Sequence, residues 1–194
     1  MALASPQPRV LADTIPAAWV RNVVLVVGAA AFVAVCAQVA IPLPFTPVPL
    51  TLQTFAVVLS AGVLGSWRGA AAMLLYAIVG SLGAPIFFQG SSGFGGVTFG
   101  YVIGFIVGAF VVGRIAEHGA TRTFWRSVGL MVVGNVIVYV FGTTWLAISL
   151  QWDPATAIAK GVLPFLVGDA IKILVAAGLL PLAWRAVRRF DHAD

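Results

Sequence analysis

Residues 21–41, RNVVLVVGAAAFVAVCAQVAI, decide the fold class of this chain. After two polar residues the stretch is apolar except at Gln38, and it is about as long as the roughly 20 residues that a helix needs to cross a bilayer. The preceding residues are polar and rich in proline, and the apolar run exceeds the length of a signal peptide without a convincing cleavage site. We therefore expect a retained transmembrane helix here.

The composition of the whole chain agrees with a membrane protein. Of its 194 residues, 61% are hydrophobic and 9% are charged, which is more apolar surface than one soluble core could bury. The net charge is +5, but the arginines form no basic stripe beside aromatic residues, so we do not expect nucleic acid as a partner. Cys36 lies alone in an apolar run, and His118 and His192 lie in charged segments. We therefore expect no disulfide, metal site or cofactor.

Proline, glycine and charged residues divide the chain into six apolar segments. They predict an all-α membrane protein with six transmembrane helices in a single domain, residues 1–194. The helices are expected at about residues 21–41, 49–64, 70–83, 98–113, 127–150 and 158–187. Pro164, Gly168 and Pro181 could break or kink the last helix. The uncharged, glycine-rich stretch at about residues 80–97 is expected to form an outer loop.

The arginines lie on alternate connections. Both tails and the connections at residues 65–69 and 114–126 hold every arginine of the chain, namely Arg9, Arg21, Arg68, Arg114, Arg122, Arg126, Arg185, Arg188 and Arg189. Because positive charge is retained on the inner side of a membrane, both termini are expected in the cytoplasm. Tryptophans fall at the predicted helix ends, Trp19, Trp67, Trp125 and Trp184 inside and Trp145 and Trp152 outside, as in an aromatic belt.

Asp169 and Lys172 are the charged residues expected deep inside the membrane, where each costs about 2.5 to 3.5 kcal/mol. At i and i+3 they share one helix face and could neutralise each other. We favour a binding site, because self-pairing leaves several donors and acceptors unused. The pair would suit a small molecule with a carboxylate at one end and an amide-like group at the other. A proton relay through Asp169 is a further alternative.

Several polar residues fall in the middle and outer parts of the predicted helices, namely Gln38, Gln53, Tyr101, Asn135, Tyr139, Thr143 and Thr144. One such residue more often bonds a neighbouring helix or its own backbone, so only their clustering favours a site. The loop at residues 80–97 lacks the GxxxxGK[ST] pattern of a phosphate site, and its glycines suit a cover over a pocket.

Two other classes of protein fit the sequence less well. A membrane enzyme would need a nucleophile with a base, or paired carboxylates, whereas Asp169 is the only acid expected at membrane depth. A channel would need polar residues in the inner half, which is almost wholly apolar. Ala30 and Ala34, with Ala37 and Ala40, form a stripe of small residues that permits close contact within the bundle or with a partner.

Three stretches of the chain have a familiar pattern. They are PLPFTPVPLTLQTFAVVLSAGVLG at residues 42–65, GAPIFFQGSSGFGG leading into FGYVIGF at residues 83–105, and GDAIK at residues 168–172. Together they resemble the BioY family, the biotin-binding S components of energy-coupling factor (ECF) transporters. The likeness extends from about Val24 to Leu182. It implies a six-helix S-component bundle in the bacterial inner membrane that binds biotin from outside beneath a mobile loop. It also implies a separate transmembrane T component and two ABC ATPase subunits as partners. An S component for another vitamin is the nearest alternative.

The resemblance also assigns roles to residues. It implies that Lys172 meets the carboxylate region of biotin and that Asp169 takes part in polar recognition. Ala30 and Ala34 match the AxxxA pattern through which S components meet the T component. The weaker candidates for contact with biotin are Gln53, Ser91, Tyr101 and Asn135.

Overall fold

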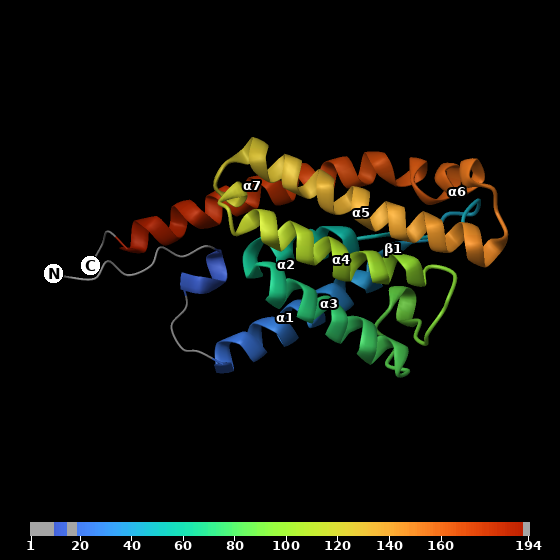
Figure 1. The fold of residues 1–194 in the computed structure, drawn as a ribbon, viewed down its shortest axis with the longest axis horizontal. Coiled ribbons are helices and arrows are strands. Elements are labelled where there is room, and N and C mark those ends of the chain that lie inside the picture. The colour runs from blue at the N-terminus through green and yellow to red at the C-terminus, as the bar shows by residue number, and fades with distance from the viewer. Residues whose placement is uncertain (1–9, 15–18, 192–194) are drawn as a thin grey trace.

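The computed structural model describes residues 10–14 and 19–191, and they are helical almost throughout. The α-helices are α1 (Trp19–Gln38), α2 (Gln53–Leu64), α3 (Ser66–Ser81), α4 (Phe99–Ala116), α5 (Phe124–Leu150), α6 (Pro154–Gly161) and α7 (Leu166–Asp191). Short 3-10 turns, η1 (Leu11–Thr14), η2 (Phe88–Gly90), η3 (Ala120–Arg122) and η4 (Leu163–Phe165), lie before or between them. The helices form one elongated bundle (Figure 1).

Four helical stretches of the described chain are long and apolar enough to cross a membrane. They are Trp19–Gln38, Phe99–Ala116, Phe124–Leu150 and Pro154–Ala186. Helix α2 has 12 residues and α3 has 16, so both are shorter than a standard span. Each of the six segments predicted from the sequence contains helix.

The second predicted helix begins later than expected, at Gln53 instead of residue 49. Two short strands, β1 (Ala40–Ile41) and β2 (Leu50–Thr51), pair in antiparallel register before it. The segment between them, PLPFTPVP, cannot continue a helix, because each proline lacks an N–H and disfavours helical geometry in the residue before it.

The last predicted helix, residues 158–187, is broken in two. Pro164 stands in η4, between α6 and α7, whereas Pro181 lies inside α7. Helix α6 therefore ends at Gly161, and its start is capped by Asp153, whose carboxylate accepts the backbone N–H of Thr156 at 3.1 Å.

Side chains satisfy two carbonyls that this break removes from the helical ladder. The Thr46 hydroxyl donates to the carbonyl of Lys160 at 2.9 Å, and the Tyr101 hydroxyl donates to the carbonyl of Gly161 at 2.8 Å. Because unpaired carbonyls are costly away from water, these two bonds stabilise the break and tie α6 to the β1–β2 connection and to α4.

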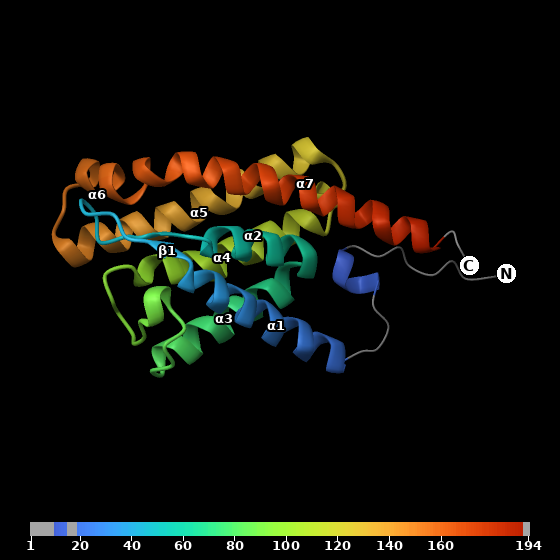
Figure 2. The same ribbon diagram turned by 180° about the vertical axis from the view of Figure 1, so that it is seen from behind.

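Helices α4 and α5 run side by side through the bundle in both views (Figures 1 and 2). Glycines allow this close approach: Gly100, Gly104 and Gly108 stand one turn apart on α4. A Cβ at Gly104 would lie 2.9 Å from the Cα of Val138 on α5, which is too close for any side chain. Small residues let helix backbones approach closely in membranes, and here they form the seam between α4 and α5.

The first residues of α1 and α3 meet at one end of the bundle, where the Arg68 side chain donates to Asn22 at 3.0 Å. Helix α7 finishes at the same end in Figure 1, and its Trp184 ring lies 5.0 Å from the guanidinium carbon of Arg122. Helix α6 and strand β1 lie toward the opposite end (Figure 2).

Candidate functional site

A cavity of about 320 Å³ lies between the β1–β2 connection, the glycine-rich loop and the helices α2, α4, α5 and α7. This volume is at the lower end of the range for small-molecule pockets. Five phenylalanines form much of its apolar wall: Phe87, Phe88, Phe99, Phe105 and Phe165. No residue of α1 in the described chain lines it.

The glycine-rich loop contributes one wall. Phe87 is buried against Gly80, whose missing Cβ would stand 2.2 Å from the Phe87 ring, and it makes an edge contact with Tyr76 at 5.2 Å between ring centres. Ser91 follows on the same loop and lines the cavity, while its hydroxyl donates to the carbonyl of Phe88 at 2.8 Å. The loop is therefore packed onto the bundle and presents Ser91 to the cavity.

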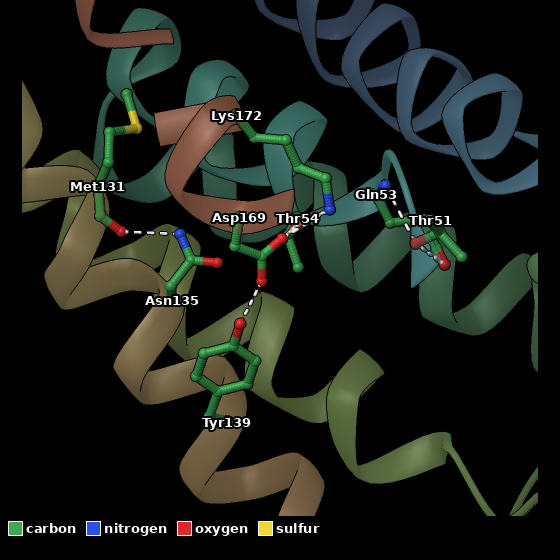
Figure 3. Close-up of polar contacts among 8 residues, drawn as sticks. All are labelled: Thr51, Gln53, Thr54, Met131, Asn135, Tyr139, Asp169 and Lys172. Atoms are coloured by element: carbon green, nitrogen blue, oxygen red, sulfur yellow. Dashed lines mark hydrogen bonds and ion pairs between the residues drawn. The ribbon is translucent and has the colours of Figure 1, made fainter. Parts of the chain in front are cut away.

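Four side chains from three helices form a polar cluster at the cavity (Figure 3). Lys172 Nζ lies 2.6 Å from Asp169 Oδ1 and 3.3 Å from Thr54 Oγ1. The Thr54 hydroxyl donates to Asp169 Oδ1 at 3.0 Å, and the Tyr139 hydroxyl donates to Asp169 Oδ2. All four residues line the cavity.

The predicted buried charges are thus paired with each other. The side chain of Asp169 is 5% exposed and that of Lys172 is 12% exposed, and one charge cancels the other. Buried ions remain expensive even when paired, unless hydrogen bonds satisfy the remaining lone pairs and protons. Thr54 and Tyr139 supply such bonds, and both residues still face open space in the cavity. The cluster can therefore keep both charges buried and still form hydrogen bonds with a ligand in the cavity.

The weaker candidates divide into two groups. Gln53 and Tyr101 line the cavity, but Gln53 Nε2 already donates to the Tyr76 hydroxyl at 2.8 Å and the Tyr101 hydroxyl is committed to α6. Asn135 is buried one turn from Tyr139 but is not among the lining residues. Its amide nitrogen donates to the carbonyl of Met131 at 3.0 Å, and its Oδ1 has no partner among the described residues (Figure 3).

The structure thus places five of the six predicted ligand residues around one cavity: Asp169, Lys172, Gln53, Tyr101 and Ser91. It adds Thr54, which the sequence did not single out, and Tyr139, which was among the polar residues expected in the middle and outer parts of the helices but not among the predicted ligand residues, because a threonine or tyrosine in a membrane helix often bonds only backbone. Thr143, which was also noted in the sequence, does so, since its hydroxyl donates to the carbonyl of Tyr139 at 2.7 Å.

The stripe predicted to meet a partner lies on α1, away from the cavity. Ala30 is 8% exposed and belongs to the apolar core of this bundle, whereas Ala34 is half-buried. The neighbouring Val27 and Val35 are 50% and 67% exposed. This side of α1 therefore offers apolar surface to lipid or to another protein. Among the described residues, no group of three or more His, Cys, Asp or Glu side chains could hold a metal ion.

Comparison with known proteins assigns the family. A model of the BioY family matches residues 7–189. The chain belongs to the BioY family. The resemblance predicted from the sequence is thereby confirmed, and the long apolar helices make this BioY family member a multi-pass membrane protein.

Several relatives of this BioY chain are named as biotin transporters. The protein from Thermotoga maritima is 41% identical over 140 residues, which cover 71% of this chain and 81% of that protein. The protein from Rhodobacter capsulatus is 38% identical over 172 residues, which cover 80% and 88% of the two chains. Both names denote transporters, in agreement with the expectation that this chain is not an enzyme.

The fold also matches a solved structure, the crystal structure of the S component for biotin from an ECF-type ABC transporter. The TM-score is 0.78, with 23% sequence identity, and the match covers 86% of this chain and 92% of that one. The bundle therefore has the S-component fold.

Proposed function

We propose that this BioY family member is the substrate-capture component of an ECF-type importer and that it binds biotin in the cavity around Asp169 and Lys172. The observation that carries the proposal is a largely apolar cavity with one compact polar cluster. Biotin has the same division, because an apolar chain and thioether ring separate a polar ureido group from a carboxylate. Few, well-placed polar contacts in an apolar pocket suit such a ligand.

The hydrogen bonds of the cluster define what it can accept. A carboxylate has about four lone-pair positions, and the contacts among the described residues use two on Asp169 Oδ1 and one on Oδ2. The ammonium group of Lys172 has three N–H donors, of which those contacts use two. One acceptor and one donor remain, which matches an N–H beside a carbonyl on one edge of the ureido ring.

The charge of the cluster favours the same orientation. The ion pair of Asp169 and Lys172 is already neutral, so a ligand carboxylate placed there would add an uncompensated negative charge in an apolar cavity. The neutral ureido group adds none. We therefore place the ureido group at the ion pair and the carboxylate toward the glycine-rich loop and Ser91. This reverses the sequence-based expectation, in which Lys172 meets the carboxylate.

The arrangement in the membrane follows the same proposal. All six predicted segments span the bilayer, α6 and α7 together forming the last, and both termini lie in the cytoplasm of a bacterium with the protein in its inner membrane. The meeting of Arg68 and Asn22 at one end of the bundle, and of Arg122 and Trp184 at that end, supports an inner face there. The cavity then opens to the outside.

Energy for transport would come from partners, a T component and two ABC ATPase subunits. We propose that the T component contacts α1 along the stripe that contains Ala30 and Ala34. Because Ala30 is buried, Ala34→Trp is the cleaner test. A bulky side chain at Ala34 should abolish biotin uptake and co-purification of the T component while biotin binding by the isolated protein persists. Loss of binding as well would show that the stripe serves packing within this bundle.

Titration of the purified protein with biotin, thiamine and riboflavin tests the substrate. Tight binding of biotin alone is expected. Tight binding of thiamine or riboflavin in place of biotin would assign the cavity to another vitamin, and binding of none of the three would remove the proposal.

A further inference from the structure

A side chain at the end of α1, a helix that does not line the cavity in the described chain, bonds the glycine-rich loop. Gln38, the last residue of α1, donates through Nε2 to the carbonyls of Phe87 at 3.1 Å and Ile86 at 3.4 Å. Its Oε1 accepts the backbone N–H of Gly90 at 2.9 Å. The amide group of this exposed residue thus bonds the backbone just before the turn η2 and the last residue of that turn.

This turn has a backbone that needs external support. Gln89 has a φ of 52°, in the left-handed region that residues with a Cβ rarely adopt, and Gly90 follows with a φ of 72°. Such conformations persist where surrounding contacts determine them. The buried ring of Phe87 supports the turn from inside the bundle, and Gln38 supports it from α1.

The segment that Gln38 bonds lies beside the cavity. Phe87, Phe88 and Ser91 line the cavity, and the backbone N–H of Phe87 donates to the carbonyl of Ser91 at 3.0 Å. The far end of the loop has separate attachments, since the indole N–H of Trp145 donates to the carbonyl of Gly96 at 3.1 Å. The middle of the loop keeps two bonds to α3 without Gln38, from the Tyr76 hydroxyl to the carbonyl of Ile86 at 3.2 Å and from the Gly93 N–H to the carbonyl of Gly80 at 2.9 Å. Loss of the Gln38 contacts would therefore loosen the turn around Gln89 and Gly90 while the rest of the loop stays attached.

A simple helix-capping role does not account for these contacts. Gln38 Nε2 also donates to the carbonyl of Ala34 at 3.0 Å, as a residue at a helix end often does. That bond would not require Oε1 to accept from Gly90, 52 residues further along the chain.

We propose that Gln38 is a positioning residue that keeps the glycine-rich loop closed over bound ligand and so limits the rate of ligand release. This role rests on the proposed function, because the ligand is taken to be biotin. It also links α1, the helix of the proposed partner stripe, to the loop that covers the cavity.

The test compares Gln38→Ala with the wild-type protein and with Gln151→Asn. Gln151 is an exposed glutamine at the end of α5, and its amide nitrogen donates to the carbonyl of Ile148 at 3.3 Å, within its own helix. Asparagine is chosen there because the φ of residue 151 is 55°, which asparagine tolerates. Release of bound radiolabelled biotin is followed after a chase with excess unlabelled biotin, and amide hydrogen exchange is followed over residues 86–93.

In Gln38→Ala, biotin release should accelerate about tenfold, the size expected for loss of one or two net hydrogen bonds, while the association rate stays within about twofold. Exchange over residues 86–93 should accelerate as well. Gln38→Glu should behave like Gln38→Ala at pH 7, because its carboxylate faces the two carbonyl oxygens. Gln151→Asn should match the wild type in both measurements.

Release from Gln38→Ala at the wild-type rate would overturn the role of Gln38, whatever the exchange shows. Acceleration of the same size in Gln151→Asn would also overturn it. A wild-type protein that binds no biotin would instead defeat the proposed function. The exchange measurement then still decides whether Gln38 holds the loop, and unchanged protection over residues 86–93 would show that it does not.

Discussion

Replacement of Lys172 by methionine tests how the cluster recognises its ligand. The change removes the ammonium group but keeps an unbranched apolar side chain. Lys172 bonds Asp169 at 2.6 Å and Thr54 at 3.3 Å, which leaves one N–H for the ligand among the contacts described. A hydrogen bond to a charged group contributes about 1.5 to 3 kcal/mol. Lys172→Met should therefore raise the Kd for biotin by roughly ten- to a hundredfold.

The assay is isothermal titration with biotin and with biotinamide, in which an uncharged amide replaces the carboxylate. If Lys172 meets the ureido group, Lys172→Met weakens both ligands equally, because they share that group. Lys160→Met is the matched control. Lys160 Nζ lies 4.8 Å from the centre of the Trp152 ring, and Lys160 is not among the residues that line the cavity, so its replacement should leave both Kd values within about twofold.

Two results would refute the reasoning. A loss for biotin with no loss for biotinamide would assign Lys172 to the carboxylate. Unchanged affinity for both ligands, in a variant that unfolds at the wild-type temperature, would mean that the ion pair only neutralises two buried charges. Asp169→Asn in the Lys172→Met background removes the carboxylate left without its counter-ion, so this double variant should unfold at a higher temperature than Lys172→Met.

Two further predictions concern topology and packing. A reporter fused after Asp194 should be active only in the cytoplasm, and one inserted near Gly93 only outside; the reverse at either position would contradict the proposed outward-facing cavity. Gly142→Ala should destabilise the protein by about 1 to 3 kcal/mol and weaken biotin binding, because the added Cβ would lie 2.4 Å from the Tyr101 ring. Gly129→Ala on the same helix meets nothing within 4 Å, and thermal unfolding should show it to be no less stable than the wild type.

The polar centre of the site could be predicted from sequence because intramembrane charges are rare. Asp169 and Lys172 stand out in an apolar stretch, and the structure pairs them at 2.6 Å. The same reasoning could not single out Thr54 or Tyr139 as members of the cluster, although Tyr139 was among the polar residues expected in the middle and outer parts of the helices. Their hydroxyls join the cluster only through the packing of α2, α5 and α7, and nothing in the local sequence separates Tyr139 from a residue such as Thr143, which bonds backbone.

The order of the helices could likewise be predicted from the lengths of the apolar segments and from the proline, glycine and charged residues between them. The short strands and the exact break in the last helix could not. The strands β1 and β2 have two residues each, too few for an alternating pattern to be visible. Pro164 marked a possible break in the last helix, as did Pro181, and only one of them ends a helix. The break occurs where the hydroxyls of Thr46 and Tyr101 can donate hydrogen bonds to the two freed carbonyls, and both residues are distant from the break in sequence.

The break between α6 and α7 also changes the electrostatic environment of the site. Helix α7 begins at Leu166, so the positive end of its macrodipole lies within one turn of Asp169. In an unbroken helix that carboxylate would sit mid-helix, where the peptide dipoles offer no net positive end. The interruption thus places a fixed source of positive potential beside this carboxylate, without an additional ionisable group in the membrane and independently of any ligand.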